Sequence, residues 1–112
     1  MHSTFKSIFP FDQELIAEYP LMEEQAVKER IERASAAFGV WKNKTFAQRG
    51  DILIRVARLM RRDQEKLATL ISREMGKVLA ESRAEIEKCA WACDYYAENA
   101  AAFLKDEKRE AG

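Results

Sequence analysis

From Val27 onward, apolar residues recur at steps of three and four, and this spacing limits the fold of the chain more than any other feature. It is the repeat of an α-helix with one apolar face. The residues between the first three apolar positions, such as Lys28 to Arg30, are charged and belong on a solvated face. The sequence predicts a first helix that starts near Glu23 and ends near Gly39. Its stripe consists of Val27, Ile31, Ala34, Phe38 and Trp41.

Two further helices are predicted after a short connection at Asn43 and Lys44. Thr45 and Gln48 have the spacing of a capping box, which marks the start of the second helix. Its inner face would be Ile52, Val56, Leu59 and Met60. Asp63 suits the N-cap of the third helix, and Gly76 suits the left-handed residue that follows it. The stripe of the third helix would be Leu67, Leu70, Ile71 and Met75.

The last helix is predicted from about residue 79 to about residue 104, because its apolar positions keep a heptad-like spacing. Several of these positions carry small side chains, which would let another element approach closely. The positions are Ile86, Ala90, Cys93, Ala97, Ala100 and Leu104.

The first 22 residues have a different pattern, with two short extended segments at residues 7–10 and 14–19. They predict a β-hairpin, although the connection from Phe11 to Gln13 lacks the glycine that favours tight turns. Tyr19 precedes Pro20 and is therefore biased away from helix. The expected fold is mainly α, with a hairpin in residues 1–22, about four helices in residues 23–104, and a frayed tail in residues 105–112.

The charge balance argues against two classes of partner. The chain has 112 residues, with 19 basic and 19 acidic side chains. A nucleic-acid binder or a protein of anionic membranes usually carries a basic excess. No apolar run approaches the length of about 18 residues that a membrane span needs, and the start lacks the core of a signal peptide. We therefore expect a cytoplasmic protein of one small domain that binds neither nucleic acid nor membrane.

No catalytic, metal or cofactor site can be assembled from motifs alone. Gly76 and Lys77 would suggest a phosphate loop only with a glycine at position 71 and a hydroxyl residue at 78, where Ile71 and Val78 stand. The single histidine is His2, so no Ser/His/Asp or Cys/His catalytic set exists. No glycine-rich dinucleotide fingerprint occurs either.

Other polar groups have a structural reading that is favoured over a functional one. Cys89 and Cys93 lie four residues apart on the last helix and are read as small packing residues rather than a disulfide or zinc site. Glu81 and Glu85 share a face and could form a carboxylate pair. We favour a structural role for them, because the helix dipole stabilises acids near a helix N-terminus. The second helix carries five arginines, which could form an anion site. We favour a solvated face on which the arginines pair with acids of neighbouring helices. The five arginines are Arg49, Arg55, Arg58, Arg61 and Arg62.

Aromatic side chains gather beside these cysteines. Trp91, Tyr95 and Tyr96 could line a substrate path, but they are read first as core or domain-contact residues.

An ordered series of segments gives a resemblance that the motifs alone do not. Glu74-Met75-Gly76-Lys77 follows an Arg- and Leu-rich helix at residues 49–60 and precedes Cys93-Asp94-Tyr95-Tyr96-Ala97. Upstream, Ala34-Ser35-Ala36-Ala37-Phe38 leads to Trp41. This series resembles the N-terminal portion of the aldehyde dehydrogenase family, in its succinate-semialdehyde dehydrogenase-like branch. The likeness covers about residues 7 to 106.

The resemblance implies an enzyme much larger than this chain. Such an enzyme oxidises an aldehyde to the acid with NAD or NADP and is a homo-oligomer. Its nucleophile, general base and cofactor contacts would lie beyond the residues present here, so this chain alone is expected to hold no cofactor and to be inactive. The helix that carries Lys88 and Trp91 resembles one that borders the substrate entrance. These two are the candidate site residues.

Two hypotheses about partners follow. In the first, the chain works with the remainder of the dehydrogenase. In the second, it is a standalone helical module that binds a full-length dehydrogenase subunit or another partner, because its apolar stripes would otherwise be left exposed.

Overall fold

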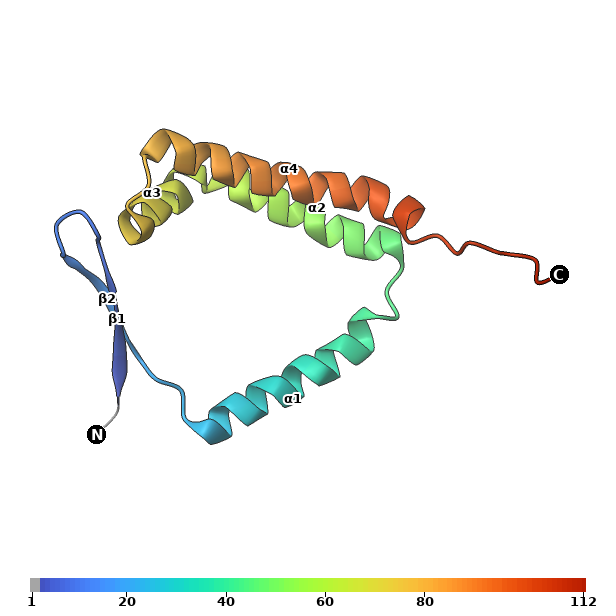
Figure 1. Cartoon of the computed structure of the whole chain (residues 1–112), viewed down its shortest axis with the longest axis horizontal. Coiled ribbons are helices and arrows are strands. Elements are labelled where there is room, and N and C mark those ends of the chain that lie inside the picture. Colours follow the sequence, from blue (N-terminus) through green and yellow to red (C-terminus); the bar gives the residue numbers. More distant parts are fainter. Residues whose placement is uncertain (1–2) are drawn as a thin grey trace.

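A computed structural model describes residues 3–112 of the chain. An antiparallel hairpin of β1 (Thr4–Ile8) and β2 (Leu15–Pro20) is followed by α1 (Glu24–Trp41), α2 (Phe46–Arg62), α3 (Gln64–Met75) and α4 (Leu79–Phe103). The mainly α fold with an N-terminal hairpin is therefore as predicted. Figure 1 shows α2 and α4 side by side, with α1 set apart from both.

The hairpin forms without a glycine in its turn, because Gln13 supplies the left-handed conformation with a φ of 64°. The N–H of Gln13 donates to the carbonyl of Phe9 at 2.9 Å, and its side-chain amide donates to the carbonyl of Pro10 at 3.1 Å. The first strand lies three residues earlier than predicted, so Phe9 and Pro10 belong to the turn and not to the strand. A bulge between Ser7 and Ile8 shifts the register with β2.

Two helix ends agree with the capping residues predicted from the sequence. Thr45 and Gln48 form the predicted capping box, with bonds of 2.9 and 3.1 Å between each side chain and the other's backbone N–H. Gly76 ends α3 in the left-handed region at φ 70°. Two expectations are wrong in detail. The first helix continues past Gly39 to Trp41, and Asp63 stands at the N-cap of α3 without a capping hydrogen bond because its carboxylate binds Arg62 instead.

The contact between α2 and α4 is the largest in the molecule and is antiparallel. Gly50, near the start of α2, packs against Ala97, near the end of α4, while Arg61 reaches Glu87 in the first half of α4. The buried core is small and consists mainly of short side chains. It comprises Ala57, Ala68, Ile86 and Ala90. Small residues on α4 thus permit the close approach that the sequence predicts.

Part of the predicted inner faces is solvent-exposed. Leu59 of α2 is 49% exposed, and Leu70 and Met75 of α3 are 45% and 74% exposed. Every residue of the α1 stripe is solvent-exposed as well. The apolar pattern predicts the helices correctly, but their apolar faces are wider than the surface that the neighbouring elements cover.

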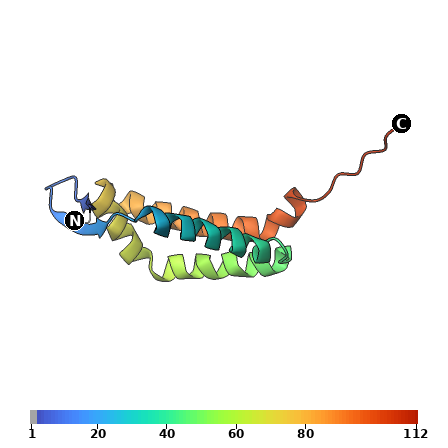
Figure 2. The same ribbon diagram turned by 90° about the horizontal axis from the view of Figure 1, so that it is seen from below.

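The chain is far more extended than a self-contained domain. Its radius of gyration is 19.7 Å and its extents are 65 × 40 × 29 Å, whereas a compact domain of this length has a radius of gyration of about 13 Å. Figure 2 shows the hairpin at one end of the helices and the tail of residues 105–112 projecting beyond the other. Among the helices described, none is long and apolar enough to cross a membrane.

Candidate functional site

Lys88 and Trp91, the two candidate site residues, lie one turn apart on the exposed surface of α4. Residues three apart on a helix are neighbours, so their side chains emerge side by side. Trp91 is 58% exposed and stacks on Tyr95, with ring centroids 5.2 Å apart and an angle of 21° between the planes. Lys88 lines a polar groove of about 450 Å³, and Trp91 is not among the residues that line this groove.

The groove beside Lys88 has two cations and two carboxylates. It is lined by Lys77, Glu81, Ala84, Glu85 and Lys88. The ammonium of Lys77 donates a 2.6 Å hydrogen bond to Glu85. This bond, with the attraction of Glu85 and then of Glu81, raises the pKa of Lys77 above its usual value. Glu85 is thus held in an ion pair, which supports the structural reading of the two glutamates over a general-acid pair.

The arginines of α2 have mixed environments. Arg61 donates to Asp94 at 2.7 Å and to Glu87 at 3.2 Å, both on α4, and these bonds raise its pKa. Arg62 pairs with Asp63. Pairing with acids of a neighbouring helix is the arrangement favoured from the sequence. Arg49 differs from them, because its Nε atom is buried and has no hydrogen-bond partner among the described residues. Nothing in the sequence separates Arg49 from the other four.

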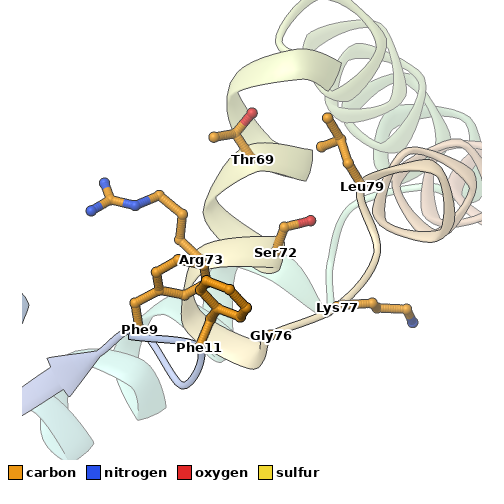
Figure 3. A pocket seen from close by; sticks show the side chains of 8 residues that line it. All are labelled: Phe9, Phe11, Thr69, Ser72, Arg73, Gly76, Lys77 and Leu79. Atoms are coloured by element: carbon orange, nitrogen blue, oxygen red, sulfur yellow. The ribbon is translucent and has the colours of Figure 1, made fainter. Parts of the chain in front are cut away.

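Gly76 and Lys77 do not form a phosphate loop. They border an apolar cavity of about 290 Å³ between the hairpin turn and the end of α3. In Figure 3, Phe9 and Phe11 from the turn face the last turns of α3, and Lys77 extends away from the two rings. A β-carbon on Gly76 would lie 3.5 Å from Pro10, so the glycine marks the packing of the hairpin on α3. The cavity is lined by Phe9, Phe11, Thr69, Ser72, Arg73, Gly76, Lys77 and Leu79.

The other groups in residues 3–112 that the sequence singles out are the two cysteines, the acidic side chains and the glycines. Cys89 is exposed and Cys93 is half-buried, and both are free thiols. No group of His, Cys, Asp and Glu side chains in this part of the chain is arranged to hold a metal ion. Of the glycines, Gly39 lies inside α1, Gly50 packs against α4 and Gly76 ends α3, so none of these three builds a dinucleotide-binding loop. The residue His2 lies outside the described part of the chain.

Comparison with known proteins identifies the family. The profile of the aldehyde dehydrogenase family matches residues 1–111. The chain belongs to the aldehyde dehydrogenase family. This aldehyde dehydrogenase sequence is 34% identical over 101 residues to the NADP⁺ succinate-semialdehyde dehydrogenase of Deinococcus radiodurans, covering 90% of the chain and 21% of that enzyme. It is 38% identical over 104 residues to a corresponding enzyme of Mycobacterium ulcerans, covering 92% of the chain and 23% of the relative.

The fold agrees with the same family. The succinic semialdehyde dehydrogenase of Streptococcus pyogenes, whose crystal structure is a complex with NADP⁺, superposes with a TM-score of 0.88 at 30% identity. The superposition covers 96% of this chain and 24% of the crystallised one. This aldehyde dehydrogenase chain therefore spans about a fifth to a quarter of the length of the relatives it matches.

Proposed function

We propose that the chain is the N-terminal part of an NAD(P)-dependent aldehyde dehydrogenase that oxidises succinate semialdehyde, or a similar short aldehyde, to the acid. One observation carries the proposal. Sequence and fold both match succinate-semialdehyde dehydrogenases over nearly the whole chain, with 34% identity in one comparison and a TM-score of 0.88 in the other. The relatives named above use NADP⁺, which supports NAD or NADP as the cofactor of the complete enzyme.

The reacting groups are assigned to the remainder of that enzyme. In the reaction, a cysteine thiolate adds to the aldehyde, hydride passes to the nicotinamide, and water releases the acid from the thioester. The family resemblance supports a nucleophile beyond the residues present here, since Cys89 and Cys93 correspond to helix positions on α4 and not to that thiolate. We therefore expect the chain alone to be inactive.

The contribution of this chain is a helical layer that packs against the remainder of the dehydrogenase. Two observations support this partner. The radius of gyration of 19.7 Å is well above the value of about 13 Å for a compact domain. The stripe of α1 is also exposed, with Ile31 and Phe38 each more than 60% accessible. Covering such a stripe is the usual source of helix stability in proteins. We propose that the complete enzyme is a homo-oligomer.

Lys88 and Trp91 are proposed to border the substrate entrance. Lys88 is exposed and takes part in no ion pair among the described residues, whereas the ammonium of Lys77 in the same groove is bound to Glu85. A cation at the mouth of a site raises the local concentration of an anionic substrate. Succinate semialdehyde carries a carboxylate at the end opposite its aldehyde. Lys88 would attract that carboxylate, while the exposed ring of Trp91 would flank the aliphatic part of the substrate.

A chimera tests the enzyme proposal. This chain would replace the corresponding region of the Deinococcus radiodurans enzyme, and NADPH formation would be measured with succinate semialdehyde. We expect activity in the chimera and none in either piece alone. A chimera that elutes at the size of the parent enzyme but forms no NADPH would overturn the proposal.

The exposed stripe of α1 also favours a second candidate function, a standalone module that binds a full-length dehydrogenase subunit. Gel filtration of the chain with a dye that reports exposed apolar surface separates the two candidates. The module hypothesis expects dye binding that is lost when a full-length subunit is added. A compact monomer that binds no dye would contradict it.

A further inference from the structure

The outer face of α4 carries a helical seam that is open to solvent. The inner face of this helix packs on α2 and α3 and includes the buried residues Ser82, Ile86 and Ala90. On the opposite side, six residues follow one another in steps of four and three, which is the spacing of a heptad seam. They are Ala84, Lys88, Trp91, Tyr95, Glu98 and Ala102. These six residues are called the outer seam.

The outer seam is accessible to another helix. Five of its six residues are solvent-exposed, and Trp91 is 58% exposed. Tyr95 is half-buried, and its ring contacts those of Trp91 and Phe103 at centroid distances of 5.2 and 6.0 Å. In Figure 1, α4 runs along the outer edge of the molecule, with α2 on its inner side.

The order of side chains along the outer seam is complementary to its own reverse. From Ala84 to Ala102 it runs small, cationic, aromatic, aromatic, anionic and small. When two identical helices pack antiparallel through one seam, the first seam residue of each copy shares a layer with the last residue of the other copy. The second residue then meets the fifth, and the third meets the fourth. The layers are Ala84 with Ala102, Lys88 with Glu98, and Trp91 with Tyr95.

The two charged positions select the antiparallel orientation. A parallel pair would place Lys88 beside Lys88 and Glu98 beside Glu98, and like charges in contact repel each other. An antiparallel pair forms two Lys88–Glu98 contacts instead, one on each side of the aromatic layers. Neither side chain takes part in an ion pair among residues 3–112, so both charges are available to a second copy.

We propose that the 112-residue chain pairs with a second copy of itself through the outer seam, as an antiparallel pair of α4 helices. The layers of Trp91 with Tyr95 supply most of the apolar contact, and the charged layers set the orientation. One helix from each copy gives a small interface, so the dimer is weak and depends on concentration. The pairing does not rest on the reaction proposed above, and it covers Lys88 and Trp91 in the paired chain.

Sedimentation equilibrium of the chain, from about 1 μM to about 1 mM, tests the proposal. We expect a reversible equilibrium between monomer and dimer. Lys88→Glu and Glu98→Lys each turn both charged contacts into like-charge contacts, so each should weaken dimerisation by about tenfold or more at low salt. Both positions are exposed, so helix content and thermal unfolding of the monomer should match the parent by circular dichroism.

An equimolar mixture of the two variants separates this interface from any other. In a heterodimer of Lys88→Glu with Glu98→Lys, both contacts again join opposite charges, so the mixture should dimerise about as tightly as the parent. Lys66→Glu, at an exposed position of α3 outside the seam, is the matched control and should also dimerise like the parent.

Three results would overturn the proposal. They are a chain that stays monomeric at every concentration, self-association that the single variants leave unchanged, and a mixture that associates no more tightly than its components. The first would leave the outer seam to the remainder of the dehydrogenase, and the second would assign self-association to another face. An inactive chimera, which would overturn the enzyme proposal, leaves the result of this experiment unchanged.

Discussion

Gly50 and Ala97 are so close that a β-carbon added to Gly50 would stand 3.2 Å from the carbonyl oxygen of Ala97. This contact lies near one end of the antiparallel pair of α2 and α4, where the helix backbones approach each other. Glycine weakens a helix interior by about 1 kcal/mol relative to alanine. Its presence at position 50 therefore reflects the space available between the two helices.

A leucine at position 50 should force α2 and α4 apart. We expect Gly50→Leu to lower the free energy of unfolding by about 1–3 kcal/mol, the usual cost of overpacking a tight contact. Thermal unfolding followed by circular dichroism measures the change. The matched control is Gly39→Ala, because Gly39 lies inside α1 with nothing within 4 Å of the added β-carbon. That variant should increase helix content, and a destabilised Gly39→Ala variant would contradict the assignment of open space there.

The hydroxyl groups of Ser72 and Ser82 should be energetically coupled. They lie 2.8 Å apart across the contact of α3 with α4, and Ser82 is fully buried. Either single substitution to alanine leaves the other hydroxyl without its partner, at a cost of about 1–3 kcal/mol. The double variant removes both groups and should cost less than the sum of the two single variants. Additive effects in urea unfolding would show that the two hydroxyls act independently.

The ion pair between α3 and α4 should make stability depend on acidic pH. The hydrogen bond from Arg83, at 2.7 Å, lowers the pKa of Glu65 from its ordinary value of 4.5. A carboxyl group whose pKa is lower in the folded state stabilises the fold above its unfolded pKa. That stabilisation is lost as the pH falls through the folded value. We expect stability to decline from about pH 4.5 downward.

Glu65→Gln should flatten this decline, as measured by thermal unfolding between pH 2 and pH 7. High salt should reduce the effect, because both side chains are largely exposed. Glu98→Gln, at an exposed position of α4 outside the ion pairs, is the control. An equal change in both variants would rule out a specific role for the pair.

The proposed role of Lys88 predicts a selective kinetic change in the active chimera. Lys88→Glu should raise KM for succinate semialdehyde by about tenfold at low salt, with little change in kcat, because an electrostatic attraction becomes a repulsion. Its effect on a neutral aldehyde such as propanal should be small. Lys66→Glu, an exposed position on α3, serves as the control. Equal effects on both substrates would show that Lys88 does not border the substrate entrance.

Features set by a few neighbouring residues could be predicted from the sequence. The capping box of Thr45 and Gln48, the stop at Gly76 and the length of α4 all depend on local backbone hydrogen bonding, and all three agree with the structure. The turn of the hairpin was harder to predict, because Gln13 adopts a left-handed conformation that is uncommon for its residue type.

Features that depend on the neighbours of a helix could not be predicted in the same way. Leu59 and Met75 belong to apolar stripes by spacing, yet both are exposed because the adjacent elements do not reach them. Ala57 and Ala68 are buried because they lie where backbones approach, which periodicity alone does not reveal. Likewise, Arg49 and Arg61 are equivalent in the sequence, and the packing leaves Arg49 Nε without an acceptor among the residues that the structure describes.

The two tryptophans of the chain occupy different surfaces, and this gives the molecule two intrinsic optical probes. Trp41 lies in the wall of a hollow of about 170 Å³ that is also lined by residues of α2 and α4, while Trp91 stacks on Tyr95 at the exposed surface of α4. In a Trp91→Phe variant, the emission spectrum reports only on the hollow. In a Trp41→Phe variant, it reports only on the surface beside Lys88. Events at the two places can therefore be timed separately in a stopped-flow fluorimeter, without attaching a dye.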